Sequence, residues 1–168
     1  TLCYPPSSIG AHVSVCPNHT AGRTTPFSTR GYVALAGTFG YELDITALSD
    51  EDKNSIPAQI ADYHRYAHLM LEGDYYRLGD VSKDSSFDAW MFVSKDKSEA
   101  LMTFVQVNSR ISTRSRRIHL DGLSPDKKYS CEGEQLPVLS GSALMYAGIN
   151  ITELYGDFAS KLIYLKEV

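Results

Sequence analysis

Long hydrophobic runs and a strong charge of either sign are both missing from this chain of 168 residues. No apolar stretch approaches the roughly 20 residues that a helix needs to cross a bilayer. Charged residues make up 21% of the composition and the formal net charge is only -4, so the chain has no general excess of basic residues to attract nucleic acid. We therefore expect neither a membrane nor nucleic acid as a partner.

Cysteine is scarce, and an initiator methionine and a signal peptide are missing. The three cysteines, Cys3, Cys16 and Cys131, cannot all pair within one chain. A chain of this size buries about 70% of the surface that its unfolded form exposes, so its core does not require disulfides. Unpaired thiols are typical of a reducing compartment, and we expect a cytoplasmic protein. Because the chain starts directly at Thr1-Leu2-Cys3, we also expect a piece of a longer protein.

Signatures of cofactor and metal sites are absent as well. The sequence contains no glycine-rich phosphate loop and no dinucleotide fingerprint. Cys3, His12, Cys16 and His19 lie near one another in sequence, but their spacing matches none of the paired patterns that build a tetrahedral zinc site. Packing cysteines and loop histidines are the favoured interpretation, with zinc as the alternative. We expect no cofactor and no metal.

What is present in the first half is an alternation of strands and helices. Ile9 to Val15 has the two-residue period of a strand, and Thr38 to Leu43 has the aromatic and apolar composition of a second one. A short helix over Arg30 to Ala36 follows the first strand, and a longer helix ending at Gly73 follows the second. This order with short connections is typical of parallel βα units. Two such strands need pairing partners that the chain does not contain.

The longer helix has a cap at its start and a proline inside it. Ser49 and Asp52 resemble a capping box. Pro57 removes a backbone donor, so we expect either a kink there or a fresh helix start with Ser55 as the cap. Spacings of three and four predict a buried stripe formed by Ile60, Tyr63, Ala67, Met70 and Leu71.

The second half has the pattern of an antiparallel β domain. Trp90 to Val93 and Ala100 to Val107 are apolar runs on either side of a charged connection, which predicts a β-hairpin. Further short strands separated by turns are expected at Ile118–Leu120, Tyr129–Glu132 and Lys161–Lys166. Such a series favours a β-sandwich. The polar segment Gly79 to Asp88 predicts the boundary, so the expected domains are residues 1–78 and 79–168.

Polar side chains on the two early strands are the candidate binding residues. His12 and Ser14 lie on the polar side of the first strand, and Glu42 lies at the end of the second. In an amphipathic antiparallel strand these side chains would meet water, whereas in a barrel strand they would point into the lumen near the catalytic rim. A Ser-His-acid triad is disfavoured, because Ser14 has no helix start behind it to form a nucleophile elbow.

Two further features have both a structural and a functional interpretation. Arg110, Arg114, Arg116 and Arg117 form the one basic cluster of the sequence. Without interleaved aromatic residues, this cluster is better explained as a solvated edge that blocks strand-to-strand aggregation than as a nucleic-acid site. Trp90 is a possible sugar-stacking platform, but its apolar neighbours in the predicted hairpin favour a place in the core.

Several short motifs are spread over nearly the whole chain. They are IGAHVS at 9–14, PNH at 17–19, GRT at 22–24, FGYELD at 39–44, GDYYRL at 73–78, AWM at 89–91, GLSPDKKY at 122–129 and GDF at 156–158. With these motifs the chain resembles the end of the family 36 glycoside hydrolases, the α-galactosidases. Two departures from that family's pattern are visible. Pro57 interrupts the last barrel helix, and Gly141-Ser142-Ala143 stands where an acidic run is usual.

The resemblance implies a mixed fold. The first part would be the C-terminal part of a (β/α)8 barrel, comprising its last two βα units, and an antiparallel β-sandwich would follow. Ile9 to Val15 and Thr38 to Leu43 would then be the seventh and eighth barrel strands. That placement makes His12, Ser14 and Glu42 substrate-binding candidates at the barrel rim.

The resemblance also implies a function for the parent protein. Family members are retaining hydrolases that remove terminal α-D-galactosyl residues from α-galactosides such as melibiose and raffinose. Their two catalytic aspartates lie on earlier strands, in a Trp-Asp and a Thr-Ser-Asp motif, and this chain has neither motif. We therefore expect no catalytic residue here, an inactive chain and an active, homo-oligomeric parent enzyme. The alternative is an independent, non-catalytic β-sandwich that binds carbohydrate or serves as a structural module.

Overall fold

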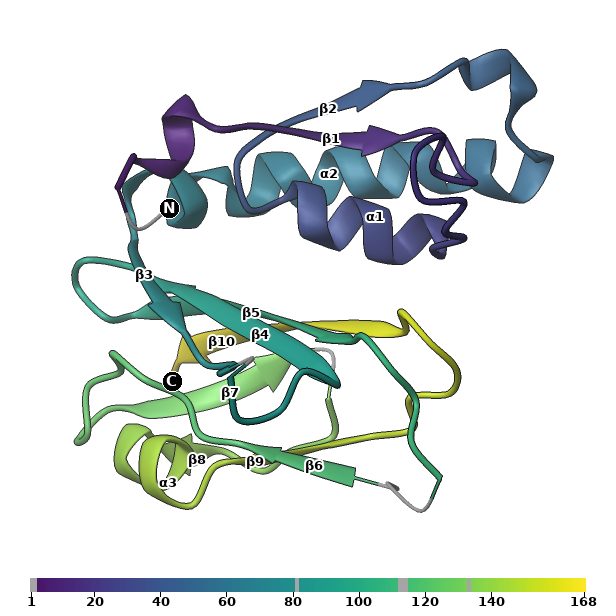
Figure 1. Ribbon diagram of the computed structural model, residues 1–168. Helices are drawn as coiled ribbons and strands as arrows, with labels where there is room; N and C mark the ends of the chain where they lie inside the picture. Colours follow the sequence, from purple (N-terminus) through teal and green to yellow (C-terminus); the bar gives the residue numbers. More distant parts are fainter. Residues whose placement is uncertain (1–2, 81, 112–114, 133) are drawn as a thin grey trace. The chain divides into compact units, whose positions relative to one another are not determined.

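The computed structural model describes residues 3–80, 82–111, 115–132 and 134–168. The chain forms two compact units, the first extending to Leu71 and the second running from Glu72 to Val168 (Figure 1). The division falls at the end of the long helix, whereas the domain boundary predicted from the sequence lies between residues 78 and 79. The short strand Asp74–Arg77 lies between these two positions, and it pairs with a strand of the second unit.

The first unit consists of a parallel strand pair and two helices. β1 (Gly10–Ser14) and β2 (Thr38–Glu42) pair in parallel along their full lengths, as the order of elements predicted. Figure 1 shows α1 (Phe27–Ala34) and α2 (Asp50–Glu72) on one side of this pair. Single 3-10 turns lie at η1 (Pro6–Ser8) and η2 (Ile45–Ala47).

Alternation along β1 separates a core face from a polar face. Val13 is fully buried and packs in a cluster with Phe27 and Ala34 of α1. Because successive side chains of a strand point to opposite faces, His12 and Ser14 lie on the face opposite Val13. The partly buried residues that complete this core are Phe39, Tyr41, Leu43, Leu48 and Ile56.

The buried face of α2 agrees with the predicted stripe at Met70 and differs from it at Ile60 and Leu71. Its buried residues are Gln59, Tyr66, Leu69 and Met70, whereas Ile60 and Leu71 are each 38% exposed. The difference arises from Gln59, whose amide nitrogen donates to the carbonyl oxygen of Phe27 at 3.1 Å. Its amide oxygen accepts from the Tyr41 hydroxyl at 2.8 Å. Hydrogen bonding thus offsets the cost of burying a polar amide, and a pattern of apolar residues alone does not show it.

The start of α2 agrees with the predicted cap. The backbone amide of Asp52 donates to the Ser49 hydroxyl at 3.1 Å, and acidic residues fill the first turn. The predicted alternative of a fresh start at Ser55 is wrong, because one helix continues through Pro57 and the Ser55 hydroxyl donates back to the Asp52 carbonyl.

No helix in the described part of the chain is both long and apolar enough to cross a membrane.

The second unit is built on a six-stranded sheet whose neighbouring strands are all antiparallel. In spatial order the strands are β3 (Asp74–Arg77), β4 (Phe87–Val93), β5 (Glu99–Gln106), β10 (Ser160–Glu167), β7 (Lys128–Glu132) and β8 (Leu139–Ser140). The predicted hairpin is confirmed as β4 and β5. The predicted C-terminal strand is confirmed as β10, which lies inside the sheet between β5 and β7.

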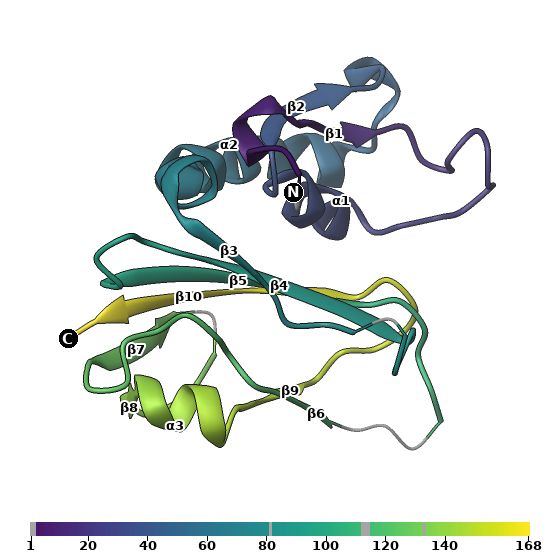
Figure 2. The ribbon, with the colours of Figure 1, turned by 60° about the vertical axis from the view of Figure 1, so that its left-hand side comes forward.

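A two-stranded ribbon covers one face of this sheet. The ribbon consists of β6 (Ser115–Ile118) and β9 (Ile149–Thr152), and α3 (Gly141–Tyr146) lies beside it. Figure 2 shows the ribbon and α3 together on one side of the sheet. The core between these two layers includes Met91, Met102, Ile163, Ile118, Ile151 and Leu144, all buried. Apolar residues at every second position of β4, β5 and β10 supply the sheet side of this core.

The described arginines of the basic cluster form contacts within the second unit. Arg116 has a side chain that is only 17% exposed, pairs with Asp84 at 2.6 Å and lies over the ring of Phe87 at 4.4 Å. Arg110 also approaches Asp84, and Arg117 donates to Asn150. Arg116 is therefore not part of a solvated edge. Arg114 lies outside the described residues.

Candidate functional site

The carboxyl ends of β1 and β2 bring two of the predicted site residues together. The imidazole Nε2 of His12 lies 2.8 Å from the Oε2 of Glu42. Their side chains are 44% and 74% exposed, so the pair is open to a ligand. His12 pairs with Gly40, two residues before Glu42, so the two side chains lie on the same face of the strand pair, and Ser14 stands directly opposite Glu42 in the register.

Gly40 gives this pair its open surroundings. The register places Gly40 opposite His12, two residues before Glu42 on the same strand. A Cβ atom added at Gly40 would meet no atom within 4 Å, so neither close packing nor an unusual φ angle explains this glycine. A glycine inside a strand weakens the strand, and it often marks the close approach of a ligand. Gly40 was not among the site residues predicted from the sequence.

Ser14 is fixed through its backbone, and no hydrogen bond joins its side chain to His12 among the described residues. The guanidinium of Arg30 on α1 donates to the carbonyl oxygen of Ser14 and to that of Thr25. The same guanidinium lies 5.0 Å from the centre of the Phe27 ring. Arg30 thereby holds the end of β1 against the start of α1. The arrangement provides no serine nucleophile with its base.

The loop after β1 is held by its own hydrogen bonds. The side-chain oxygen of Asn18 accepts from the amides of Thr20 and Ala21, at 3.1 and 2.9 Å. The Cys16 sulfur accepts from the amide of Thr25 at 3.4 Å.

Within the described part of the chain, no group of three or more His, Cys, Asp or Glu residues is placed to hold a metal ion. Cys3, Cys16 and Cys131 are free thiols.

The turn after β2 is stabilised by an aspartate cap. Asp44 accepts from both the hydroxyl and the backbone amide of Thr46, at 2.6 and 2.9 Å. These hydrogen bonds lower the pKa of the Asp44 carboxyl, so it is ionised at neutral pH. The cap fixes the path of the chain just beyond Glu42.

A second candidate site lies in the other unit and was not expected from the sequence. It is a pocket of about 670 Å³, lined mainly by polar and charged side chains, with an ion pair between Lys161 and Glu134 on its wall. Its residues come from positions 134–136, 150, 152–153 and 161, which are far apart in the chain. No local motif unites them, so only the folded arrangement reveals the pocket.

Comparisons with known proteins cover both units. Residues 1–73 match the family model described as Melibiase, and residues 87–165 match that of the glycosyl hydrolase family 36 C-terminal domain. The bifunctional alpha-galactosidase/sucrose kinase AgaSK of Mediterraneibacter gnavus is 44% identical over 98% of the chain. Alpha-galactosidase AgaA of Geobacillus stearothermophilus is 42% identical over 100% of it. The chain belongs to glycoside hydrolase family 36.

Solved structures of family 36 members match the fold of both units. The galactosidase domain of AgaSK gives a TM-score of 0.93 at 42% identity and covers 98% of this chain. A variant of the Geobacillus AgaA in complex with raffinose gives a TM-score of 0.93 at 41% identity and covers 99%. The chain spans 18% of the length of AgaSK and 23% of that of AgaA.

Membership of family 36 in both units disfavours the alternative of an independent sugar-binding module. The similarity runs through the first unit as well as the second. Trp90, which that alternative needs as a stacking platform, is only 8% exposed. The prediction that Trp90 belongs to the core is confirmed.

Proposed function

We propose that this chain supplies the end of the catalytic barrel and the C-terminal domain of a retaining α-galactosidase. The observation that carries the proposal is the identity of 42–44% to two α-galactosidases along the whole chain. The parallel pair β1 and β2, each followed by a helix, fits the last two βα units of a (β/α)8 barrel. The sheet and its covering ribbon fit an antiparallel β-sandwich.

The chemistry of such an enzyme divides between this chain and the rest of the barrel. A retaining hydrolase uses one carboxylate as nucleophile and a second as acid and then base, about 5 Å apart. The resemblance assigns both roles to aspartates in motifs that this chain lacks. The chain's own contribution is therefore to bind and orient the sugar.

His12, Ser14 and Glu42 are the residues that we propose for this binding. The carboxylate of Glu42 accepts hydrogen bonds from sugar hydroxyls, and its contact with His12 fixes the orientation of both side chains. The second ring nitrogen of His12 has no partner within the described residues and is available to a hydroxyl group. The space beside Gly40 lets a ring approach the strand closely.

We extend the proposal to substrate, location and assembly. The substrates are terminal α-galactosides such as melibiose and raffinose, and the AgaA variants solved with raffinose and stachyose support this class. The three free thiols support a reducing compartment, so we propose a cytoplasmic enzyme.

A homo-oligomer follows from the family resemblance. Light scattering of the full-length enzyme tests it, and a monomer would contradict it.

A chimera tests the catalytic proposal. This chain replaces the corresponding C-terminal segment of the Geobacillus AgaA, so that the aspartates come from AgaA and the last two barrel units come from this chain. We expect the purified chimera to release galactose from raffinose. A chimera that folds, as judged by cooperative unfolding, but hydrolyses no α-galactoside would contradict the proposal.

Matched variants of the chimera test the site residues separately. Glu42→Gln removes the charge that strengthens hydrogen bonds to sugar hydroxyls, so we expect kcat/KM to fall about tenfold or more. The control is Glu51→Gln, an exposed residue in the first turn of α2, which should leave kcat/KM unchanged. If both variants behave like the parent chimera, the assignment of Glu42 fails while the family function stands.

A further inference from the structure

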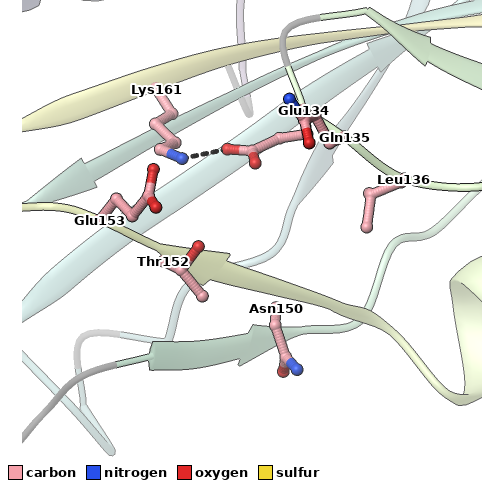
Figure 3. Close-up of a pocket in the computed structure, with 7 residues that line it drawn as sticks. All are labelled: Glu134, Gln135, Leu136, Asn150, Thr152, Glu153 and Lys161. Carbon is pink, nitrogen blue, oxygen red and sulfur yellow. Dashed lines mark hydrogen bonds and ion pairs between the residues drawn. The ribbon is translucent and has the colours of Figure 1, made fainter.

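The pocket of the second unit is formed by three segments that meet only in the fold. These are the β7–β8 connection, the end of β9 and the start of β10 (Figure 3). A volume of about 670 Å³ lies within the range of roughly 300–1,000 Å³ that is typical of small-molecule sites. The pocket belongs to a different unit from the His12–Glu42 pair.

A partly buried ion pair forms one wall of the pocket. The ammonium of Lys161 pairs with the carboxylate of Glu134, and the two side chains are only 19% and 14% exposed. The backbone amide of Leu136 donates to the carbonyl oxygen of Glu134 at 2.9 Å, which holds the connection in a tight turn. Lys161 projects from a strand inside the sheet. Both charged groups are thus held in place before any ligand binds.

Glu153 supplies a second carboxylate. Its backbone has a φ angle of 57°, and Figure 3 shows its carboxylate turned toward the Lys161 ammonium. The Glu153 side chain has no hydrogen-bond or ion-pair partner within the described residues. Its acceptor oxygens are therefore available to a ligand.

The remaining wall adds a donor and an apolar contact. The side-chain oxygen of Asn150 accepts from Arg117 at 3.3 Å, and Figure 3 shows this amide turned away from Glu134 and Lys161, so Asn150 lines only the rim of the pocket. Thr152 adds a hydroxyl, which both donates and accepts. Leu136 contributes an aliphatic surface. The pocket therefore offers donors, acceptors and one apolar contact.

Charge decides which ligand class fits. Two carboxylates and one ammonium give the wall a formal charge of about -1, which disfavours an anion. A divalent cation is disfavoured because the ammonium of Lys161 already stands beside the carboxylates. Since Leu136 is the one aliphatic lining residue, an apolar molecule would leave the polar groups without partners. The class that fits is a neutral molecule with many hydroxyl groups.

We propose that this pocket is a secondary binding site for a neutral saccharide, and specifically for α-galactosides. The carboxylates of Glu153 and Glu134 accept from ring hydroxyls, while Lys161 and the Thr152 hydroxyl donate to them. Leu136 contacts the apolar C–H groups of the sugar. The choice of α-galactosides rests on the proposed function, whereas the saccharide class rests on the pocket itself. The site adds binding to the hydrolase and needs no exposed aromatic platform.

Nuclear magnetic resonance of the 168-residue chain tests the proposal with raffinose as the ligand. We expect saturable shifts of the backbone amide signals of residues 134–136, 150–153 and 161 at millimolar raffinose. Glu153→Gln should weaken this binding about tenfold, because an acceptor with full charge is lost. Thr152→Val, which keeps the size but loses the hydroxyl, should weaken it about fivefold. The unshifted signals of the other residues report whether each variant has folded.

The control is Asp126→Asn, an exposed position outside the pocket, which should bind raffinose like the parent chain. Shifts confined to residues near His12 and Glu42, no saturation, or equal binding by all variants would each overturn the pocket site. Maltose, which contains no galactose, is the comparison sugar. If maltose binds as tightly as raffinose, the assignment to α-galactosides is overturned. Hydrolysis by the chimera is a separate readout, so that result does not bear on the proposed function.

Discussion

Gln59 shows how one buried side chain determines the packing of an element. It is 8% exposed, donates to the carbonyl of Phe27 and accepts from the hydroxyl of Tyr41. Gly31 of α1 leaves room for it, since a Cβ atom there would lie 2.5 Å from the Gln59 amide nitrogen. One side chain thus connects α2 to α1 and β2.

Replacing this amide with an apolar group tests its role. Gln59→Leu leaves the Tyr41 hydroxyl and the Phe27 carbonyl without this partner, so we expect the free energy of unfolding to fall by about 2 kcal/mol. Urea unfolding followed by circular dichroism measures the change. Ile60→Ala is the neighbouring control, and its effect should be less than half as large because Ile60 is 38% exposed. A larger loss of stability in Ile60→Ala than in Gln59→Leu would contradict this role of Gln59 and would support the predicted stripe, which includes Ile60.

Asp84 is a residue whose charge matters to the second unit. Its carboxylate accepts from the Ser86 hydroxyl and from the Arg116 guanidinium, each at 2.6 Å. The hydrogen bonds from Ser86, followed by those from Arg116, hold the pKa of Asp84 well below its ordinary value. The ionised form is therefore favoured more strongly in the folded chain than in the unfolded one.

The sign of this pKa shift predicts an acid dependence of stability. Because the folded pKa is depressed, the contribution of Asp84 is complete above the unfolded pKa of about 4 and is lost as the pH falls below it. We expect the urea midpoint to drop less between pH 7 and pH 3 in Asp84→Asn than in the parent chain. Ser86→Ala, which removes the largest cause, should show an intermediate drop. Identical drops in all three proteins would contradict this prediction.

At the scale of elements, α2 tolerates a proline within its length. The helix begins at Asp50 and continues through Pro57 to Glu72. Proline has no backbone N–H, so the carbonyl oxygen of Lys53 loses the donor that would come from four residues further on. The Ser49 cap and the acidic first turn stabilise the segment before the proline. Packing of the whole helix thus outweighs the low helix propensity of Pro57.

Removing the proline should stabilise the chain. Pro57 is exposed, so Pro57→Ala loses little packing and regains a helical hydrogen bond. We expect the free energy of unfolding to rise by about 1–3 kcal/mol, as measured by urea titration. Asn54→Ala changes an exposed residue of the same helix without altering a backbone donor, and it should gain less than about 0.7 kcal/mol. A destabilised Pro57→Ala chain would show that the local backbone is adapted to proline.

At the scale of the whole molecule, the chain combines two units of different construction. The first has a parallel strand pair, and the second has an antiparallel sheet with a covering ribbon. Family 36 similarity extends through both, yet the chain spans only 18–23% of the length of AgaSK and AgaA. The two motifs to which the resemblance assigns the catalytic aspartates do not occur in this sequence.

Activity of the isolated chain is therefore expected to be absent. Without a nucleophilic carboxylate the covalent route of a retaining hydrolase is closed. The purified chain should release no galactose from a chromogenic α-galactoside above the rate of a buffer blank. The intact Geobacillus AgaA is the positive control. Turnover by this chain would show that a carboxylate within it, such as Glu42, acts as nucleophile.

Local elements and family membership were predictable from the order of residues alone. Alternation of side chains predicted the first strand, and aromatic and apolar composition predicted the second strand and the β4–β5 hairpin. The motifs around His12 and Glu42 carried the resemblance to family 36, which the comparisons bear out. Both kinds of signal lie within short stretches of chain, so no knowledge of the fold was needed.

Contacts between residues that are far apart in the chain became visible only in the folded molecule. The phase of α2 depends on hydrogen bonds from Gln59 to residues that are far away in sequence, and apolar spacing cannot detect a satisfied amide. β3 joined the second sheet through its pairing with β4. The contact of His12 with Glu42 and the pocket around Lys161 likewise arise from strand register and layer packing. These long-range contacts follow from how whole elements pack, which local sequence patterns do not encode.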